Sequence, residues 1–206
     1  MAKSAANLLI SINQMGKLLF VTGNQNKVKE IKAILGETIE LIGLKEVGWT
    51  AEIPETTGTI KGNSLQKATT VFDELGLDCF AEDTGLEVFA LNGEPGVNSA
   101  RYAGANKSSE DNMDLLLDKL AGIEDRSAQF RTVITLLINE EKHFFEGICK
   151  GKIAVERQGK GGFGYDPIFI PDNYSLSFGE LSPQVKNQIS HRGKAVSLLI
   201  DYLKTI

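Results

Sequence analysis

The sequence predicts a mixed α/β fold with a long central sheet. A short apolar run over 17–24 ends in turn-forming residues and leads into a helical pattern over 25–36. Farther along the chain, 127–140 and 142–156 are long, β-rich and joined by a short polar turn, as in an antiparallel hairpin. The 206 residues are 42% hydrophobic and 24% charged, which suffices for one domain with a sizeable core or for two small lobes around a cleft.

The first half of the chain alternates strands and helices. The run 17–24 is expected to be a buried strand, and 25–36 places its apolar residues on one helical face before it ends at Gly36. A strand, a polar turn and a helix in this order place backbone N–H groups and Lys27 at a helix N-terminus, where anions are stabilised. The next expected elements are a helix over 60–76, a strand over 78–83 that ends in two acids, an extended segment over 85–91 and a helix over 108–122.

The second half contains the hairpin, a glycine-rich turn and a final amphipathic helix over 189–206. The turn "GGFGYDP" (161–167) is poor in core-forming residues, so its backbone is expected to bend sharply or to approach a ligand closely. From Gly159 to Gly164 the spacing is formally G-x-G-x-x-G. A dinucleotide site requires a strand before this motif and a helix after it, whereas here a strand over 168–170 follows, so that interpretation fails.

Composition excludes several classes of protein. A net charge of −5 argues against a broad surface for nucleic acid or anionic membrane. Cys79 and Cys149 lie in apolar contexts without C-x-x-C spacing and are interpreted as buried reduced thiols. No run reaches the ~20 apolar residues of a membrane span. The segment 1–15 lacks a plausible signal cleavage site and is predicted to be a flexible extension, and the protein is expected to be cytoplasmic.

Two segments near the strand ends carry candidate chemistry. "TGNQNK" (22–27) supplies a hydroxyl, an amide and an ammonium at a helix start, although Thr22 or Asn24 would also serve there as an ordinary helix cap. "AEDTGL" (81–86) contains Glu82 and Asp83, whose charges are costly on an apolar strand unless they are paired or bind a cation such as Mg²⁺.

Two further segments contain aromatic and cationic residues. Lys186, His191 and Arg192 gather around a predicted helix start, where the macrodipole disfavours positive charge, and this placement favours a binding role. Phe163 or Tyr165 in the glycine-rich turn is suited to stack on a purine. Asp166, His191 and Arg192 would then supply hydrogen bonds to the edge of the base.

The segments "TGNQNK", "PETTGT", "AEDTGL", "PGVNSARYAG", "GGFGYDPIF" and "ISHRGKA" occur in this order. Together they resemble the inosine triphosphate pyrophosphatase family, which removes non-standard purine nucleotides, and the resemblance covers 17–206. It implies an elongated α/β structure with a mixed central sheet, flanking helices and two lobes around a substrate cleft. It further implies a homodimer that hydrolyses XTP, ITP and dITP to the monophosphate and pyrophosphate with Mg²⁺.

The resemblance also implies roles for individual residues. Asp83 would be the proton acceptor and a metal ligand, Glu55 the second metal-linked carboxylate, and Lys27 the catalytic cation that neutralises phosphate charge. Residues 16–206 would form a single domain acting on a small nucleoside triphosphate, with no nucleic-acid or membrane partner. The implied substrate-binding residues are Thr22, Gly23, Asn24, Lys27, Lys67, Thr84, Arg101, Phe163, Gly164, Tyr165, Asp166, Lys186, His191 and Arg192.

The chain departs from the family pattern at three places. Glu82 stands where many bacterial relatives carry Asp, Gly62 stands where an acid often precedes Asn63, and 1–15 has no counterpart. Two other classes of function remain open. A nucleotide sensor would bind without turnover, although carboxylates beside phosphate argue against it. A γ-phosphate hydrolase or kinase is disfavoured because the P-loop and kinase motifs are missing.

Overall fold

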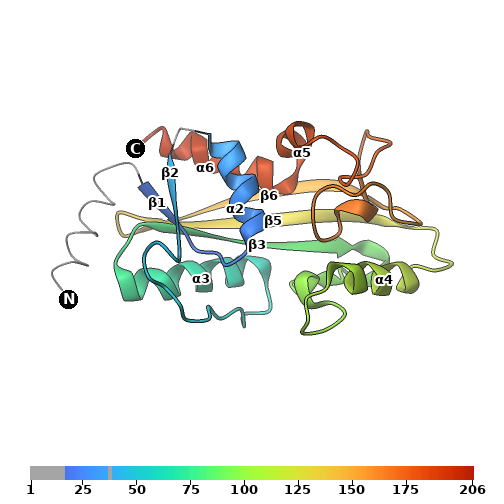
Figure 1. Ribbon diagram of the computed structural model, residues 1–206, viewed down its shortest axis with the longest axis horizontal. Coiled ribbons are helices and arrows are strands. Elements are labelled where there is room, and N and C mark those ends of the chain that lie inside the picture. The colour runs from blue at the N-terminus through green and yellow to red at the C-terminus, as the bar shows by residue number, and fades with distance from the viewer. Residues whose placement is uncertain (1–16, 37–38) are drawn as a thin grey trace. The chain divides into compact units, whose positions relative to one another are not determined.

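The computed structural model describes residues 17–36 and 39–206, so the extension predicted over 1–15 lies outside the described residues. Figure 1 shows strands and helices along the chain, and the strands pair in one sheet, which confirms the mixed α/β prediction. The strands are β1 (Lys17–Phe20), β2 (Glu40–Gly43), β3 (Cys79–Val88), β4 (Pro95–Gly96), β5 (Ser127–Ile138), β6 (Glu141–Ile153) and β7 (Phe169–Pro171). The α-helices are α2 (Gln25–Leu35), α3 (Ile60–Leu75), α4 (Ser109–Lys119), α5 (Pro183–Ile189) and α6 (His191–Leu203).

The sheet is mixed, with the strand order β2-β1-β3-β5-β6-β7 and with β4 paired to β3. β1 pairs in parallel with β2 and with β3, so helices α2 and α3 provide the crossovers that parallel neighbours require. β3 pairs with β4, and β6 with β7, in antiparallel fashion. This arrangement places the last residues of β1 beside the start of β3, since Leu19 is in register with Cys79 and Phe20 with Phe80.

The predicted hairpin is confirmed by β5 and β6, which are neighbours in the sheet and are joined by Asn139 and Glu140. Both linking residues have positive φ angles, 50° and 64°. Two consecutive residues of this kind make a turn whose twist matches that of the two flanking strands.

The described chain divides into two compact units. Unit 1 contains the described residues up to Asp83, together with Val133–Phe145 and Val196–Ile206. Unit 2 contains Thr84–Thr132 and Glu146–Ala195. Strands β3, β5 and β6 therefore contribute residues to both units. A substrate cleft between two lobes, and a single domain over 16–206, stay predictions.

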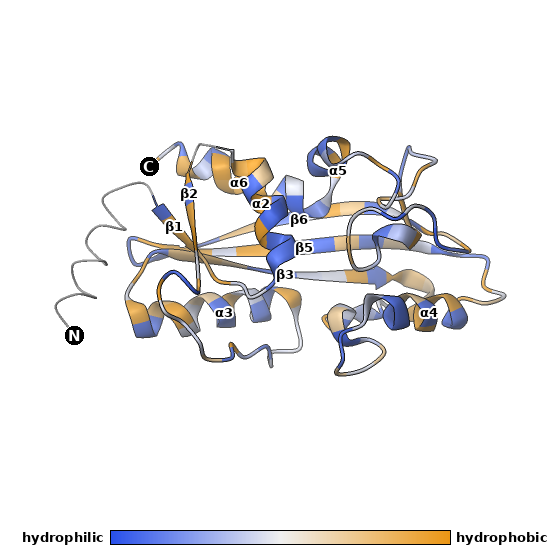
Figure 2. Ribbon diagram, viewed as in Figure 1, coloured by the Kyte–Doolittle hydropathy of each residue, from blue (hydrophilic) through white to orange (hydrophobic). Residues whose placement is uncertain are grey.

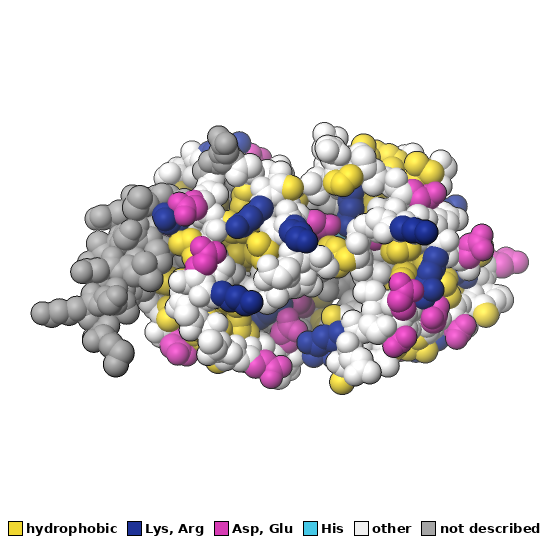
Figure 3. Space-filling model, viewed as in Figure 1, with side chains coloured by type: hydrophobic (Ala, Val, Ile, Leu, Met, Phe, Trp, Pro, Cys, Tyr) yellow, Lys and Arg dark blue, Asp and Glu magenta, His cyan; other side chains and the backbone are white. Residues whose placement is uncertain are grey.

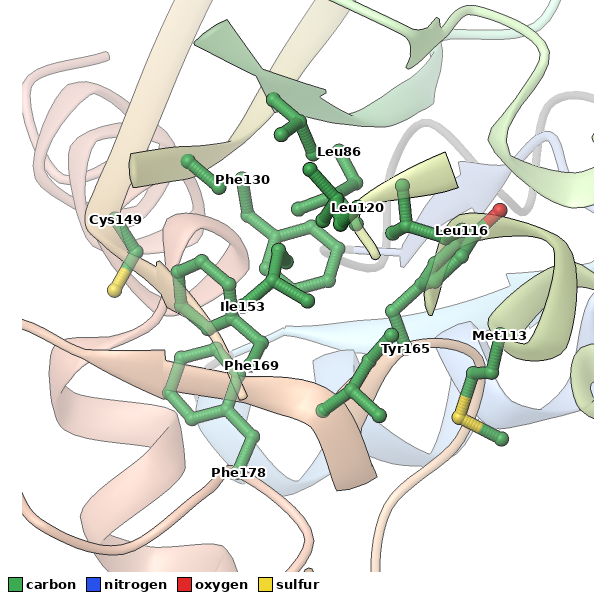
Figure 4. Close-up of a cluster of buried hydrophobic side chains, with 13 residues drawn as sticks. Leu86, Met113, Leu116, Leu120, Phe130, Cys149, Ile153, Tyr165, Phe169 and Phe178 are labelled. Carbon is green, nitrogen blue, oxygen red and sulfur yellow. The ribbon is translucent and has the colours of Figure 1, made fainter. Parts of the chain in front are cut away.

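Each unit has its own apolar core. In unit 1, α3 covers one face of the strands and α2 covers the other (Figure 1), and the core collects residues such as Val21, Val71 and Ala81. In unit 2, the aromatic residues Phe130, Phe169 and Phe178 pack with Leu86 and Leu116, among others (Figure 4). Helices α3 and α4 carry both hydrophobic and hydrophilic residues (Figure 2), as expected for helices that bury one face.

The surface carries charges of both signs. On the face shown in Figure 3, Lys and Arg side chains lie among Asp and Glu side chains instead of gathering in one basic patch. Within 17–36 and 39–206, every helix is too short or too polar to cross a membrane. Cys79 and Cys149 are buried free thiols, as predicted, and burial raises the pKa of Cys79 to about 12.

Three sequence-based boundaries were wrong. The strand predicted to end at Asp83 continues to Val88, because the residues after the two acids also pair in the sheet. The extended segment over 85–91 closes in a 3-10 turn, Phe89–Leu91. The final helix begins only at His191, since Ser190 is extended and ends the separate helix α5.

Candidate functional site

The turn between β1 and α2 is held by its own side chains. Asn24 caps α2 by accepting hydrogen bonds from the backbone N–H groups of Asn26 (2.9 Å) and Lys27 (3.3 Å). Thr22 Oγ1 accepts from the N–H of Asn24 at 3.1 Å. The interpretation of Asn24 as a helix cap is therefore confirmed. At Gly23, a Cβ would meet nothing within 4 Å. These hydrogen bonds hold the backbone of the turn in place.

Lys27 pairs with the first of the two acids on β3. Its Nζ lies 3.1 Å from Glu82 Oε1, and the Glu82 side chain is fully buried, with 0% exposure. A buried carboxylate is costly unless a positive charge or hydrogen bonds compensate it. The pair therefore joins the start of α2 to the middle of β3 within unit 1.

A second group in unit 1 places one ammonium between two carboxylates. Lys67 Nζ, from the middle of α3, lies 2.8 Å from Asp83 Oδ1 and also contacts Glu55 Oε1. The Lys67 and Asp83 side chains are 9% and 10% exposed, whereas that of Glu55 is 32% exposed. Burial lowers the pKa of Lys67, but the attraction of Asp83 and Glu55 outweighs it, so the pKa is raised above its usual value.

Glu55 and Asp83 form a suitable donor set for a hard divalent cation. Both carboxylates contact the Lys67 ammonium nitrogen, so they lie close to each other, and a metal ion would bind beside this ammonium. Mg²⁺ is commonly held by one or two carboxylates together with water and substrate phosphates. Among the described residues, no group of three or more His, Cys, Asp or Glu side chains has the arrangement of an all-protein metal site. The donor set fits Mg²⁺ shared with a phosphate ligand.

The glycine-rich turn lies in unit 2 and closes on Asp166. Asp166 Oδ2 accepts a hydrogen bond from the N–H of Phe163 at 2.6 Å and pairs with Lys186 Nζ at 2.6 Å. Gly162 has φ 71°, and a Cβ there would lie 2.0 Å from Asp166 Oδ2. The glycine therefore allows the turn to wrap around a buried carboxylate. Gly164 also adopts a positive φ, 63°.

The two aromatic residues of this turn differ. The ring of Phe163 is half-buried and has Lys186 Nζ 5.2 Å and Arg192 Cζ 5.5 Å from its centroid. Tyr165 is only 4% exposed, lies in the core of unit 2 and donates its hydroxyl to the carbonyl of Ser99 at 2.9 Å. Because core packing already covers the Tyr165 ring, the structure favours Phe163 of the two for stacking on a base. A substrate-binding role for either residue stays a prediction.

His191 and Arg192 open helix α6 and are both buried, at 3% and 2% exposure. The His191 ring stacks on Phe130, with the centroids 4.5 Å apart. Arg192 donates to Thr84 Oγ1 at 3.4 Å, and Thr84 Oγ1 shares a hydrogen bond with Thr132. These contacts hold the imidazole and the guanidinium in fixed positions near the glycine-rich turn.

The predicted residues thus fall into two groups within separate units. Unit 1 brings together Lys27 with Glu82, and Glu55 with Lys67 and Asp83. Unit 2 brings together Phe163, Asp166, Lys186, Arg192 and Thr84 through the contacts given above, and His191 precedes Arg192 on α6. Arg101 lies exposed in a 3-10 turn, Ser99–Arg101, of unit 2.

Sequence reasoning missed Asn63, Thr132 and the pairing of Glu82. Asn63 is 2% exposed and donates to Asp83 Oδ2 at 3.4 Å. A signal was present, since Asn63 and Lys67 are polar residues one helical turn apart on the face of α3 that also buries Val71. At Gly62 a Cβ would lie 2.2 Å from Thr57 Oγ1, so this chain has no room for a larger side chain at that position.

The fold and these contacts define an α/β protein with a carboxylate–lysine group beside a capped helix and a second group of cations around an aromatic ring. The sequence model of the Ham1 family matches residues 18–202. The chain belongs to the Ham1 family, which confirms the resemblance noted from its motifs.

Individual relatives are similar over nearly their whole length. The chain is 52% identical over 187 residues to the dITP/XTP pyrophosphatase of Flavobacterium johnsoniae, covering 91% of this chain and 97% of the relative. It is 52% identical over 190 residues to the protein of the same name from Porphyromonas gingivalis, covering 92% and 98%. The solved Ham1 protein of Staphylococcus aureus superposes with a TM-score of 0.84 at 40% identity, covering 92% of this chain and 98% of that one. A Ham1 protein from Coxiella burnetii gives 0.86 at 38% identity, covering 93% and 100%.

Proposed function

We propose that this protein hydrolyses the non-standard purine nucleoside triphosphates XTP, ITP and dITP to the nucleoside monophosphate and pyrophosphate in a Mg²⁺-dependent reaction. The observation that carries the proposal is the group in which Lys67 lies between the carboxylates of Glu55 and Asp83. Binding alone does not need carboxylates beside phosphate, whereas hydrolysis needs a proton acceptor and a cation site. The names of the relatives from Flavobacterium johnsoniae and Porphyromonas gingivalis support the same substrates.

The residues of unit 1 would act on the triphosphate. Lys27 would neutralise phosphate charge, and Thr22, Gly23 and Asn24 would face the phosphates at the N-terminus of α2, where an anion is stabilised. Neutralising this charge matters because the phosphate anions repel an incoming nucleophile.

Glu55 and Asp83 would hold Mg²⁺ together with the substrate phosphates. When bound, the metal would neutralise phosphate charge and lower the pKa of a water molecule. Lys67 contacts both carboxylates and keeps them close despite their mutual repulsion. Asp83, whose side chain is 10% exposed, would orient the attacking water and accept its proton. The new bond joins the water oxygen to the α-phosphorus, and the bond from the α-phosphorus to the bridging oxygen breaks as pyrophosphate leaves.

The residues of unit 2 would recognise the base. Phe163 would stack on the purine, and Lys186, His191 and Arg192 would direct donors toward the carbonyl at C6 of hypoxanthine or xanthine. Adenine carries an amino donor at C6, so donor would face donor. A site built to hydrogen-bond one group rejects an analogue that lacks it by about 10⁴-fold or more.

Product analysis tests the proposal directly. ITP is incubated with the protein and Mg²⁺, and the products are identified by chromatography. We expect IMP and pyrophosphate. IDP and phosphate would instead indicate a γ-phosphate hydrolase, and binding without turnover would indicate a nucleotide sensor. Either of these two results would overturn the proposal.

The proposal includes a homodimer located in the cytoplasm, with no nucleic-acid or membrane partner. The net charge of −5 supports the absence of a nucleic-acid or membrane partner, because nucleic acids and anionic lipids attract basic surfaces. Sedimentation equilibrium of the purified chain measures the oligomeric state, and a mass of 22.4 kDa at all concentrations would contradict the dimer.

A further inference from the structure

Two amide side chains of α3 hold the loop that carries Glu55. Gln66 Oε1 accepts the N–H of Thr56 at 2.9 Å, and Gln66 Nε2 donates to Thr56 Oγ1 at 2.9 Å. The N–H of Thr56 belongs to the peptide bond directly after Glu55, so this contact fixes the backbone next to the carboxylate.

Asn63 holds the following residue of the same loop. Asn63 Oδ1 accepts from both the N–H and the hydroxyl of Thr57, at 3.1 Å and 2.9 Å. Its Nδ2 donates to Asp83 Oδ2 at 3.4 Å. The side chain is 2% exposed, so its hydrogen bonds are shielded from water. One buried amide therefore contacts both the Glu55 loop and the second carboxylate.

Gly62 allows the loop to lie this close to α3. A Cβ at this position would be 2.2 Å from Thr57 Oγ1 and 2.7 Å from Thr59 Oγ1. Thr59 caps α3 by accepting the N–H of Gly62 at 3.0 Å. The helix start and the loop thus pack against each other through a position with no side chain.

We infer that Asn63 and Gln66 are positioning residues that set the separation of the Glu55 and Asp83 carboxylates and thereby the affinity for the catalytic divalent cation. The inference rests on the proposed function. Each amide acts through the loop: the Gln66 side chain hydrogen-bonds to Thr56, whereas the Asn63 side chain hydrogen-bonds to Thr57 and Asp83. Neither would touch the nucleotide. Residues that orient metal ligands in this way typically contribute about 10–100-fold to metal affinity or activity.

The test compares Asn63→Ala and Gln66→Ala with the control Thr70→Ala. Thr70 lies on the same helix, and its hydroxyl donates to the carbonyl of Gln66 without contacting the loop. The first measurement is backbone amide hydrogen exchange without metal or nucleotide. We expect faster exchange at Thr57 in Asn63→Ala and at Thr56 in Gln66→Ala. Gln66→Glu keeps the acceptor and should retain protection of the Thr56 amide.

The second measurement is titration with Mn²⁺ alone, together with the Mg²⁺ concentration that gives half-maximal pyrophosphate release from saturating ITP. In Asn63→Ala and Gln66→Ala, we expect the Kd for Mn²⁺ and the half-maximal Mg²⁺ concentration to rise by about tenfold or more. In Thr70→Ala, each of these two quantities should rise by less than about twofold. Asn63 is buried, so Asn63→Ala is the variant at risk of misfolding. Gln66→Ala then tests the positioning role independently.

The outcomes separate the two proposals. If wild-type protein releases no pyrophosphate, the proposed function fails, while amide exchange and Mn²⁺ titration still test the positioning role. If the loop amides exchange faster but Mn²⁺ and Mg²⁺ act at unchanged concentrations, the inference is overturned. Unchanged amide exchange in both variants also overturns it, because the amides would then not hold the loop.

Discussion

Lys67 Nζ lies 2.8 Å from Asp83 Oδ1 while it also contacts Glu55, so one buried ammonium connects a loop, helix α3 and strand β3 within unit 1. The carboxylates of Glu55 and Asp83, which contact the same ammonium, would repel each other without a positive charge between them. Lys67 therefore keeps the two carboxylates together.

Asp83→Asn should reduce pyrophosphate release from ITP by about 10²-fold or more, the scale lost with a general base. The variant should still fold, because Lys67 keeps Glu55 as a partner. Its cost in unfolding free energy should stay below the roughly 3–5 kcal/mol of a buried charge left unpaired. Asp78→Asn, a partly buried acid just before β3, is the matched control. Turnover near the wild-type rate at saturating Mg²⁺ would remove Asp83 from the mechanism.

The raised pKa of Lys67 predicts a loss of stability in alkali. Burial is its largest single influence and lowers the pKa, but the combined attraction and hydrogen bonds of Asp83 and Glu55 raise it above 10.5. A folded-state pKa above the unfolded value means that the stabilisation is complete below pH 10.5 and is lost as pH rises through the folded value. Denaturant unfolding between about pH 9 and 12 should show this decline in wild-type protein and a shallower one in Lys67→Met. Parallel curves would contradict the assignment.

Lys27→Met should weaken triphosphate binding and also destabilise the fold, because Lys27 pairs with fully buried Glu82. The expected cost in unfolding free energy is on the order of 3 kcal/mol. Adding Glu82→Gln should restore much of that stability without restoring binding. Calorimetry with inosine and with the α,β-imido analogue of ITP checks this. Lys27 would have a structural role if the double variant regained affinity for the analogue. The same conclusion would follow if Lys27→Met weakened the binding of inosine and of the analogue equally.

Arg192→Ala should reduce ITP turnover more than residual ATP turnover, and so narrow the ITP/ATP ratio of kcat/KM. Discrimination against GTP should change less, because GTP shares the C6 carbonyl. Arg192→Lys keeps the charge but loses the planar group 5.5 Å from the Phe163 centroid, so it should restore only part of the ratio. Equal slowing of ITP and ATP would show that Arg192 serves phosphate or structure.

Phe163→Leu and Tyr165→Phe should separate base stacking from core packing. Phe163→Leu removes a half-buried ring and should raise KM for ITP, since base–aromatic stacking contributes about 1–3 kcal/mol. Tyr165→Phe removes only the hydroxyl that donates to Ser99, so it should cost about 1 kcal/mol of stability and leave KM unchanged. Steady-state kinetics and thermal unfolding measure both effects, and the reverse pattern would assign the stacking role to Tyr165.

Local patterns predicted most of the elements. Several features depend on residues within a few positions of one another, so the sequence predicts them directly. These are the apolar run at β1, the cap at Asn24, the hairpin over β5 and β6, and the glycine-rich turn. The boundary at Asp83 was predicted wrongly because charged residues usually mark a strand end, whereas here Lys67 makes a buried charge tolerable within the strand.

The sequence alone determined the α/β class, the family and the chemical types that gather in its motifs, because these follow from short-range periodicity and from the order of the segments. Only the tertiary structure decided that Glu82 faces Lys27, that Asn63 joins the Glu55 loop to Asp83, and that the Tyr165 ring belongs to a core. The physical reason is that each of these relations depends on how helices and loops pack against the sheet and against one another. Side-chain chemistry permits several partners for each residue. Packing between residues distant in the chain determines which of them is contacted.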